Sequence, residues 1–360
     1  MFKAFWRPEA ILFVSVFCLT LAVQYASWSY FDYTDQEVWE SAVSIFSEGK
    51  EISLSDVSFG YPGMTILWLG RFFVAEGMLV PKATALSISI LISFSVALAT
   101  LLAYLLRKNS FWFAGVFGLL LFSRLYTFAT PPSAVVTPLI VSLFLYMLYL
   151  FERPNIGKRS LIFLGVLLGL ALLTRLDIGL LVFCAVLVPA YVLFREKTFY
   201  IFGFSCLVFV LGDTHLWHTP LTYIYEVFIK IQDHTLHTYG GHTYVNIFTS
   251  SPLAFISLVF GLILFFGYKK EFTLPRGYFV WFLVTTLGIA ALLLIPESRV
   301  VWYFYPLLFT WEILLPLFLF MLLPKIQVPK PFLFLNEKRL EAVTVSLLIG
   351  SQFVLLLSIL

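Results

Sequence analysis

Residues 82–106 read KATALSISILISFSVALATLLAYLL, and after Lys82 this stretch contains no charged side chain. A helix of about 20 apolar residues is long enough to cross the hydrocarbon core of a bilayer. Apolar stretches of similar length recur along much of the 360-residue chain. They predict a bundle of membrane-spanning helices, because a helix satisfies its backbone hydrogen bonds internally and is therefore stable in lipid.

The composition also indicates a membrane protein. Hydrophobic residues make up 61% of the chain and charged residues 12%, whereas soluble domains carry about 45–50% and about 25%. These values exclude a water-soluble enzyme, a nucleic-acid-binding protein and a disordered chain. The three cysteines lie inside apolar runs and show no disulfide or zinc pattern, so we interpret them as buried small apolar residues.

We predict an all-α polytopic membrane protein with about eleven spans, in which residues 1–360 form a single transmembrane domain. The predicted spans are residues 9–28, 82–106, 111–128, 132–151, 160–174, 178–194, 199–213, 250–268, 277–295, 302–323 and 340–360.

The distribution of basic residues predicts the orientation. A cytoplasmic N-terminus places most of the 23 Lys and Arg residues on the cytoplasmic side, as the positive-inside rule requires. We therefore expect an integral multi-pass protein with a cytoplasmic N-terminus. The expected location is a prokaryotic plasma membrane. One alternative is open, in which the short span 160–174 fuses with 178–194 and reverses the sidedness of everything that follows.

Two predicted outer loops differ from the rest of the chain in their charged and titratable residues. The first loop, residues 29–81, begins with seven acidic residues and one base, Lys50; the second, residues 214–249, contains all five histidines. Polar groups beside a membrane core are costly and tend to be placed for function. We therefore expect the functional site on these two loops, at the extracytoplasmic face.

The first loop has the pattern of two helices lying on the membrane surface. The first is predicted after Thr34 and is capped near Thr34 or Asp35; the apolar residues at helical spacing are Trp39, Ala42, Val43, Ile45 and Phe46. A turn at residues 59–63 precedes the second, which we predict over 64–80 and which ends at Pro81.

In order and sidedness these elements resemble the GT-C superfamily of integral-membrane glycosyltransferases. The resemblance consists of the acids after the first span, a surface helix ending at Gly49, the Tyr-Pro-Gly turn at 61–63, the Leu-Thr-Arg-Leu-Asp segment at 173–177, and Pro-Glu-Ser-Arg at 296–299 followed by Tyr303. Many members have two adjacent acids, whereas here Gln36 separates Asp35 from Glu37.

The resemblance implies transfer of a monosaccharide from a polyprenyl-phosphate donor to a lipid-linked glycan, a cell-surface polymer or a protein. It implies that Asp35 is the base that takes the proton of the acceptor hydroxyl, with Asp32 and Glu37 as alternatives. Asp35 is equally an N-cap candidate.

The donor phosphate requires positive groups, and the resemblance implies Arg299, Tyr303 and Arg175. Alternative interpretations are an interfacial anchor for Arg299 and an intramembrane ion pair of Arg175 with Asp177.

The second loop supplies candidates for binding the sugar or the acceptor. Gly240 and Gly241 let the backbone approach a ligand beside His242, and Tyr239 and Tyr244 are suited to stack on a sugar ring. We include Tyr61 of the first loop in this group. The alternative is that these aromatic residues anchor the loops.

The histidines leave a metal site open, because His215 with His218 and His234 with His237 are spaced to share a helix face. No further metal-binding motif accompanies them, so we assign no residue as a metal ligand. A divalent ion bound at the outer loops is the alternative. The expected partners are the lipid-linked donor, the acceptor and membrane lipid, and no nucleic acid.

A different class of function stays open. A secondary transporter or lipid flippase would use Glu312, Arg175 and Asp177 as intramembrane polar sites. An inactive accessory subunit with the same fold is the third alternative.

Overall fold

The computed structural model describes residues 7–27, 36–50, 63–106, 131–151 and 155–236, and between these ranges residues 110–111, 113–115, 117–118, 121 and 153. Within these residues the regular elements are all helices, with no strand. The prediction of an all-helical protein is therefore confirmed for this part of the chain. The predicted spans from residue 250 onward, and much of 111–128, lie outside the described residues.

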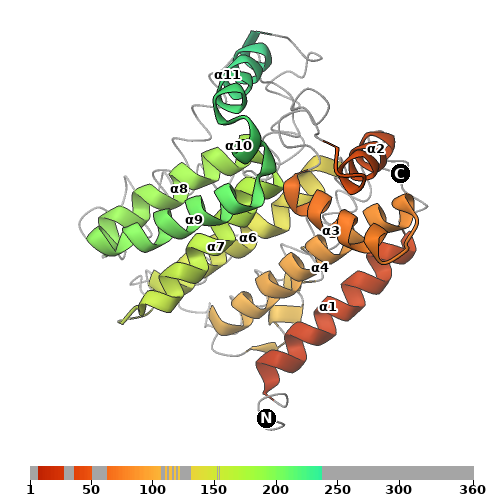
Figure 1. Cartoon of the computed structure of the whole chain (residues 1–360). Helices are drawn as coiled ribbons and strands as arrows, with labels where there is room; N and C mark the ends of the chain where they lie inside the picture. The colour runs from red at the N-terminus through yellow and green to blue at the C-terminus, as the bar shows by residue number, and fades with distance from the viewer. Residues whose placement is uncertain are drawn as a thin grey trace, which may run out of the picture.

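Six of the helices run side by side as a bundle (Figure 1). They are α1 (Pro8–Ser27), α4 (Val80–Leu106), α6 (Pro131–Phe151), α7 (Lys158–Thr174), α8 (Leu176–Phe194) and α9 (Thr198–Gly212). Their bounds differ from the predicted spans by at most two residues. Among the described residues, α1 and α4 are long and apolar enough to cross a membrane.

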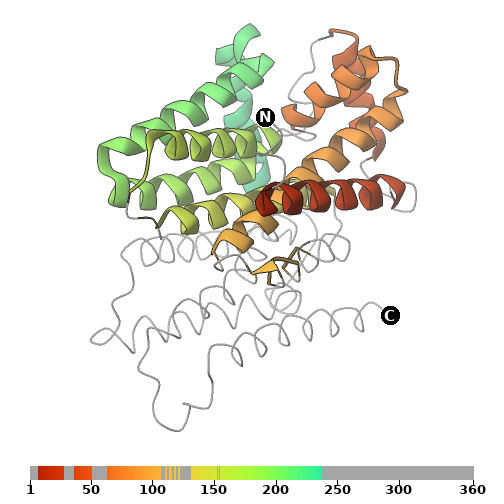
Figure 2. The same cartoon turned by 90° about the horizontal axis from the view of Figure 1, so that it is seen from below.

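Small residues let these helices approach closely. A Cβ at Gly165 of α7 would lie 2.7 Å from the carbonyl oxygen of Ile201 in α9, and one at Gly169 would lie 2.6 Å from the Cβ of Val208. Between α6 and α4, the buried Ser142 hydroxyl donates to the carbonyl of Ser95 at 2.7 Å. Such small-residue packing is typical of helices in lipid, where apolar burial gives no driving force for association. Figure 2 shows the resulting arrangement, with α7–α9 grouped on one side and α1 against α4 on the other.

The outer surface of this bundle is apolar. Large side chains of α1, α8 and α9 are exposed, among them Leu19, Tyr191, Phe199, Leu207 and Leu211. Apolar surface of this extent marks contact with lipid or protein, and it favours membrane association.

The cysteines correct one expectation. Cys18 and Cys184 are exposed and Cys206 is partly exposed, so the interpretation of all three as buried residues is wrong. In a chain that packs in lipid, an apolar residue needs no burial in protein to avoid water, and a thiol is tolerated on the outer surface.

Arg175 separates α7 from α8. Its backbone is extended, with φ −160° and ψ 108°, and α8 turns back along α7, so that Gly179 packs against Leu172. The two helices are separate, and the alternative of one fused helix is excluded.

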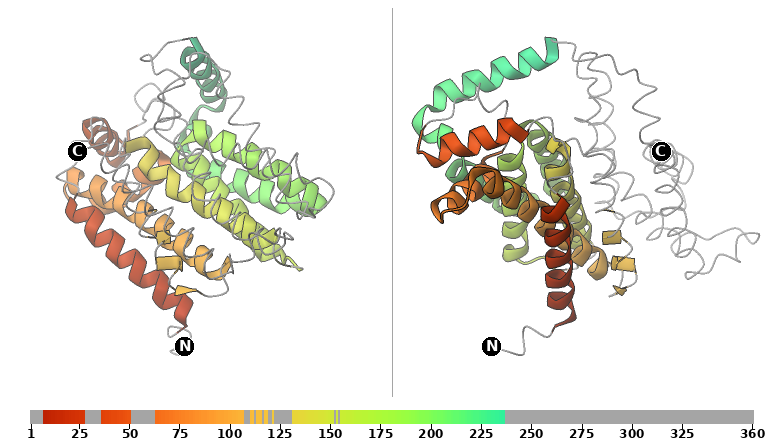
Figure 3. Two further views of the ribbon diagram at one scale, coloured as in Figure 1. Left: turned by 180° about the vertical axis from the view of Figure 1, so that it is seen from behind. Right: turned by 90° about the vertical axis from the view of Figure 1, so that its right-hand side faces the viewer.

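Four helices, α2 (Gln36–Ser47), α3 (Met64–Ala75), α10 (Thr214–His218) and α11 (Pro220–Leu236), lie at one end of the bundle. The right-hand view of Figure 3 shows α2, α3 and α11 crossing that end at a large angle to the bundle helices. α2 buries Trp39, Ala42, Val43 and Phe46, the face predicted from helical spacing. Gly49 follows it with φ +73°, a left-handed conformation that glycine adopts without strain.

The end of α3 differs from the prediction. α3 ends at Ala75, and the turn falls at Gly77, whose φ is +88°, so the predicted break at Pro81 is wrong. Pro81 lies in the first turn of α4, where a missing backbone N–H removes no helical hydrogen bond. α10 and α11 occupy much of the second loop, for which no helix bounds were predicted.

We expect Gly63→Ala to destabilise the fold by about 1–3 kcal/mol, because the added methyl group would overlap the backbone carbonyl oxygens of Thr174 and Leu173. Thermal unfolding in lipid measures this. The control is Gly203→Ala inside α9, where a Cβ has no atom within 4 Å. Equal unfolding midpoints of wild type and Gly63→Ala would contradict the packing described.

Candidate functional site

Elements of the two predicted outer loops lie at the same end of the bundle. α3 of the first loop begins against the last turn of α7, and Gly63 leaves no space for a side chain there. The hydroxyl groups of Thr65 and Thr174 lie 3.1 Å apart and form a hydrogen bond. We call this contact between the start of α3 and the ends of α7 and α9 the junction.

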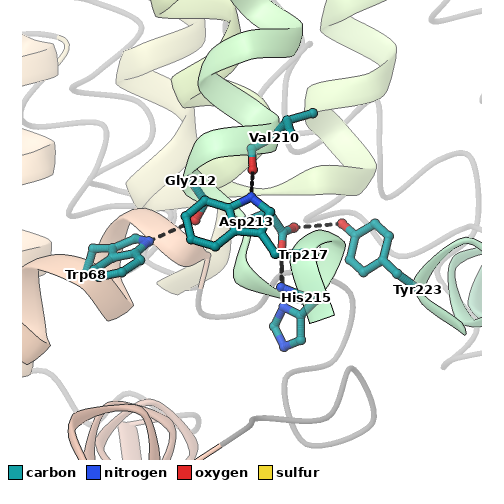
Figure 4. A network of polar contacts seen from close by, with 7 residues as sticks. All are labelled: Trp68, Val210, Gly212, Asp213, His215, Trp217 and Tyr223. Carbon is teal, nitrogen blue, oxygen red and sulfur yellow. Dashed lines mark hydrogen bonds and ion pairs between the residues drawn. The ribbon is translucent and has the colours of Figure 1, made fainter. Parts of the chain in front are cut away.

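Trp68 extends the junction to α9. Its indole Nε1 donates to the carbonyl oxygen of Gly212 at 2.8 Å (Figure 4). Its ring packs edge-on against Phe46 of α2, with the ring centres 5.2 Å apart. The Arg71 guanidinium carbon lies 5.4 Å from the centre of the Phe46 ring and 5.8 Å from that of Trp68. These contacts link α2, α3 and α9.

Asp213, which is only 4% exposed, directly precedes the second loop. Its Oδ1 accepts hydrogen bonds from the backbone N–H of His215 at 3.0 Å, which caps α10, and contacts Nδ1 of the same residue at 3.0 Å. Its Oδ2 accepts from the Tyr223 hydroxyl at 2.9 Å (Figure 4). Several donors stabilise a carboxylate that burial would otherwise penalise.

Tyr223 holds α11 on the end of the bundle. Its ring packs with Leu172 and Leu176, the residues of α7 and α8 that flank the Arg175 break. Burial, and then the neighbouring Asp213 carboxylate, raise the pKa of Tyr223 above its ordinary value near 10. The hydroxyl therefore stays protonated and remains a hydrogen-bond donor.

In the Asp213–His215 pair the carboxylate contacts Nδ1 and fixes the orientation of the imidazole. The His215 side chain is 16% exposed. The sequence predicted His215 only as one of a histidine pair and did not predict Asp213 or Tyr223. Asp-Thr-His directly after an apolar run is an N-cap signal that identifies Asp213.

Of the predicted site residues, the structure describes two. Glu37 lies in the first turn of α2 and is exposed, where its charge favours the helix N-terminus. Arg175 is buried at the α7–α8 break, with 6% exposed. The remaining predicted residues lie outside the described residues: Asp32, Asp35, Tyr61, Tyr239, His242, Tyr244, Arg299 and Tyr303.

Within the described part of the chain, no group of three or more His, Cys, Asp or Glu residues is placed to hold a metal ion. His237 and His242, and the side chains of His218 and His234, lie outside that part. The metal alternative at the outer loops therefore stays untested.

No family model, curated protein or solved structure matches this chain. A proposal of function therefore rests on the chain's own residues.

We expect Tyr223→Phe to lower stability by about 1.5–3 kcal/mol, since Asp213 Oδ2 loses its donor while the carboxylate stays buried. Tyr225→Phe on the same helix is the control, because that side chain is 66% exposed.

The raised pKa of Tyr223 adds a pH dependence. Above about pH 10 the unfolded chain loses this proton and the folded chain keeps it, so wild-type stability falls as pH rises. Between about pH 9 and about pH 11, the unfolding midpoint of Tyr223→Phe should therefore fall less than that of wild type. Parallel pH profiles for wild type and variant would be inconsistent with this account.

Proposed function

We propose that the chain is a GT-C-like glycosyltransferase that moves a monosaccharide from a polyprenyl-phosphate donor to a lipid-linked glycan, a cell-surface polymer or a protein. In this proposal it has about eleven spans and lies in a prokaryotic plasma membrane, with its site on the extracytoplasmic side. The residues assigned to the site are the base Asp35, with Asp32 and Glu37 as alternatives; Arg299, Tyr303 and Arg175 at the donor phosphate; and His242, Tyr239, Tyr244 and Tyr61 at the sugar or acceptor.

One observation supports the proposal most: the described parts of the two loops are attached to the same end of the bundle. The contacts Thr65–Thr174 and Trp68–Gly212 attach the first loop to α7 and α9. Asp213 and Tyr223 attach the second loop beside Arg175. α2, which follows Asp35 directly in the sequence, packs on α3 at the same end.

The charges of the bundle support the orientation. Arg153, Lys158, Arg159, Arg195 and Lys197 lie in the connections α6–α7 and α8–α9 and in the first turn of α7, at the end opposite the junction. We call this the basic end. Under the positive-inside rule it faces the cytoplasm, which puts the junction on the outer side.

In the proposed reaction the acceptor oxygen attacks the anomeric carbon of the sugar, and the bond from that carbon to the phosphate oxygen breaks. The base, Asp35, takes the proton of the acceptor hydroxyl. The polyprenyl phosphate leaves with the electron pair, and the arginines stabilise its added negative charge. With one base and one displacement, the configuration at the anomeric carbon inverts.

A single-turnover assay tests this proposal with the purified full chain in lipid and a panel of radiolabelled polyprenyl-phosphate sugars. Asp35→Asn should slow transfer by about 100-fold or more, the contribution of a general base, and Arg299→Ala should weaken use of the same donor. Glu48→Gln is the control, because this carboxylate lies on the same loop, is exposed, and pairs with Lys50 at 2.6 Å.

Equal transfer by wild type and Asp35→Asn would remove Asp35 from the mechanism. If wild type binds no donor of the panel, the glycosyltransferase proposal fails. Substrate uptake driven by an ion gradient and lost in Glu312→Gln would then support the transporter alternative.

A further inference from the structure

A cavity of about 370 Å³ lies at the basic end of the bundle, away from the junction. It is enclosed by the second half of α4, the end of α6, the connection that follows α6, and the start of α7. The two described residues of the proposed transferase site, Glu37 and Arg175, do not line it.

The lining has two chemically different parts. Leucine side chains of α4 form an apolar floor, namely Leu98, Leu101, Leu102 and Leu105. Polar groups from the α6–α7 side form a rim, among them Arg153, Asn155 and Ser160. Arg153 and Asn155 are exposed, so the cavity opens to the surface where they lie. Among the described residues that line this cavity, none is acidic.

Aromatic side chains hold Arg153 at this rim. Its guanidinium carbon lies 4.3 Å from the centre of the Tyr149 ring, and its Nη2 donates to the Tyr149 hydroxyl. Tyr149 stacks on Tyr146, whose ring meets Phe163 edge-on at 5.1 Å. A guanidinium carries five N–H donors in a rigid fork, so the contact with one hydroxyl leaves capacity to bind an anion.

We propose that this cavity binds an anionic phospholipid from the leaflet at the basic end. The phosphate binds Arg153, with Ser160 and Asn155 as further donors, and the adjoining part of an acyl chain packs on the α4 leucines. The volume falls within the range typical of small-molecule sites.

The lining itself selects this class of ligand. A free inorganic anion gains nothing from a leucine floor, and the ammonium group of a zwitterionic lipid meets no acidic partner among the described lining residues. Lys158 and Arg159, both exposed beside the rim, add positive potential, which draws anionic lipid to the same surface. A ligand held between α4, α6 and α7 stabilises the folded chain by mass action.

Lipid binding by the full chain in neutral detergent tests the proposal. The probes are phosphatidylglycerol and phosphatidylcholine with identical chains, and inorganic phosphate, with dissociation constants measured by native mass spectrometry or calorimetry. Wild type should bind phosphatidylglycerol at least about tenfold more tightly than phosphatidylcholine, and Arg153→Gln should lose about tenfold of that affinity.

Two further variants locate the site. Arg159→Gln removes an exposed basic charge that does not line the cavity, and it should keep most of the affinity. Asn155→Trp narrows the mouth with the charge unchanged and should weaken binding. A photoreactive phosphatidylglycerol should label peptides of α4 and of the α6–α7 connection.

Equal affinity for the two lipids would overturn the proposal, as would phosphatidylglycerol binding that is unchanged in Arg153→Gln. If inorganic phosphate binds as tightly as the lipid, the cavity is an anion site to which an acyl chain adds nothing, and the lipid proposal is wrong. Each variant's unfolding midpoint in lipid-free detergent serves as the folding control: a loss of binding supports the proposal only where that midpoint matches wild type.

Discussion

The arrangement of the site end depends on one close contact: Gly63, at the start of α3, packs on the backbone carbonyls that end α7. Only a residue without a side chain fits there, and the contact fixes where the first loop enters the bundle. From that position Trp68 reaches Gly212, and α2 packs on α3 through Phe46. If α3 began one helical turn further from α7, neither the Thr65–Thr174 bond nor the Trp68 bond would form.

A buried carboxylate plays the corresponding part in the second loop. Asp213 ends α9, caps α10 and accepts from Tyr223 of α11, so one side chain orders three elements. A charge next to apolar helices is costly unless it is fully hydrogen-bonded. Because Tyr223 also packs beside Leu172 and Leu176, the polar network and the Arg175 break form one continuous structure.

The bundle helices were predictable because apolar run length and flanking charge determine where a chain crosses lipid. The buried face of α2 followed from helical spacing around Trp39 and Phe46. The break at Gly77 was missed, because Pro81 is the stronger local signal and its tolerance in a first helical turn depends on where the helix begins. The Thr65–Thr174 contact joins residues 109 positions apart, and no local pattern encodes it. Asp213 carries an N-cap signal, but its hydrogen bond with Tyr223 depends on how α11 packs against the bundle, which the sequence alone does not indicate.

The most direct test of this account is a disulfide between Thr65→Cys and Thr174→Cys, with Cys18, Cys184 and Cys206 replaced by alanine. Hydroxyl oxygens 3.1 Å apart place the two thiols within bonding reach. Mild oxidation of the protein in lipid should give one cross-linked species in high yield. Thr65→Cys with Thr198→Cys, at the basic end, should give none. No cross-link in the first pair, or equal cross-linking in both, would contradict the junction, and with it the attachment of the first loop to the end of the bundle on which the proposed site rests.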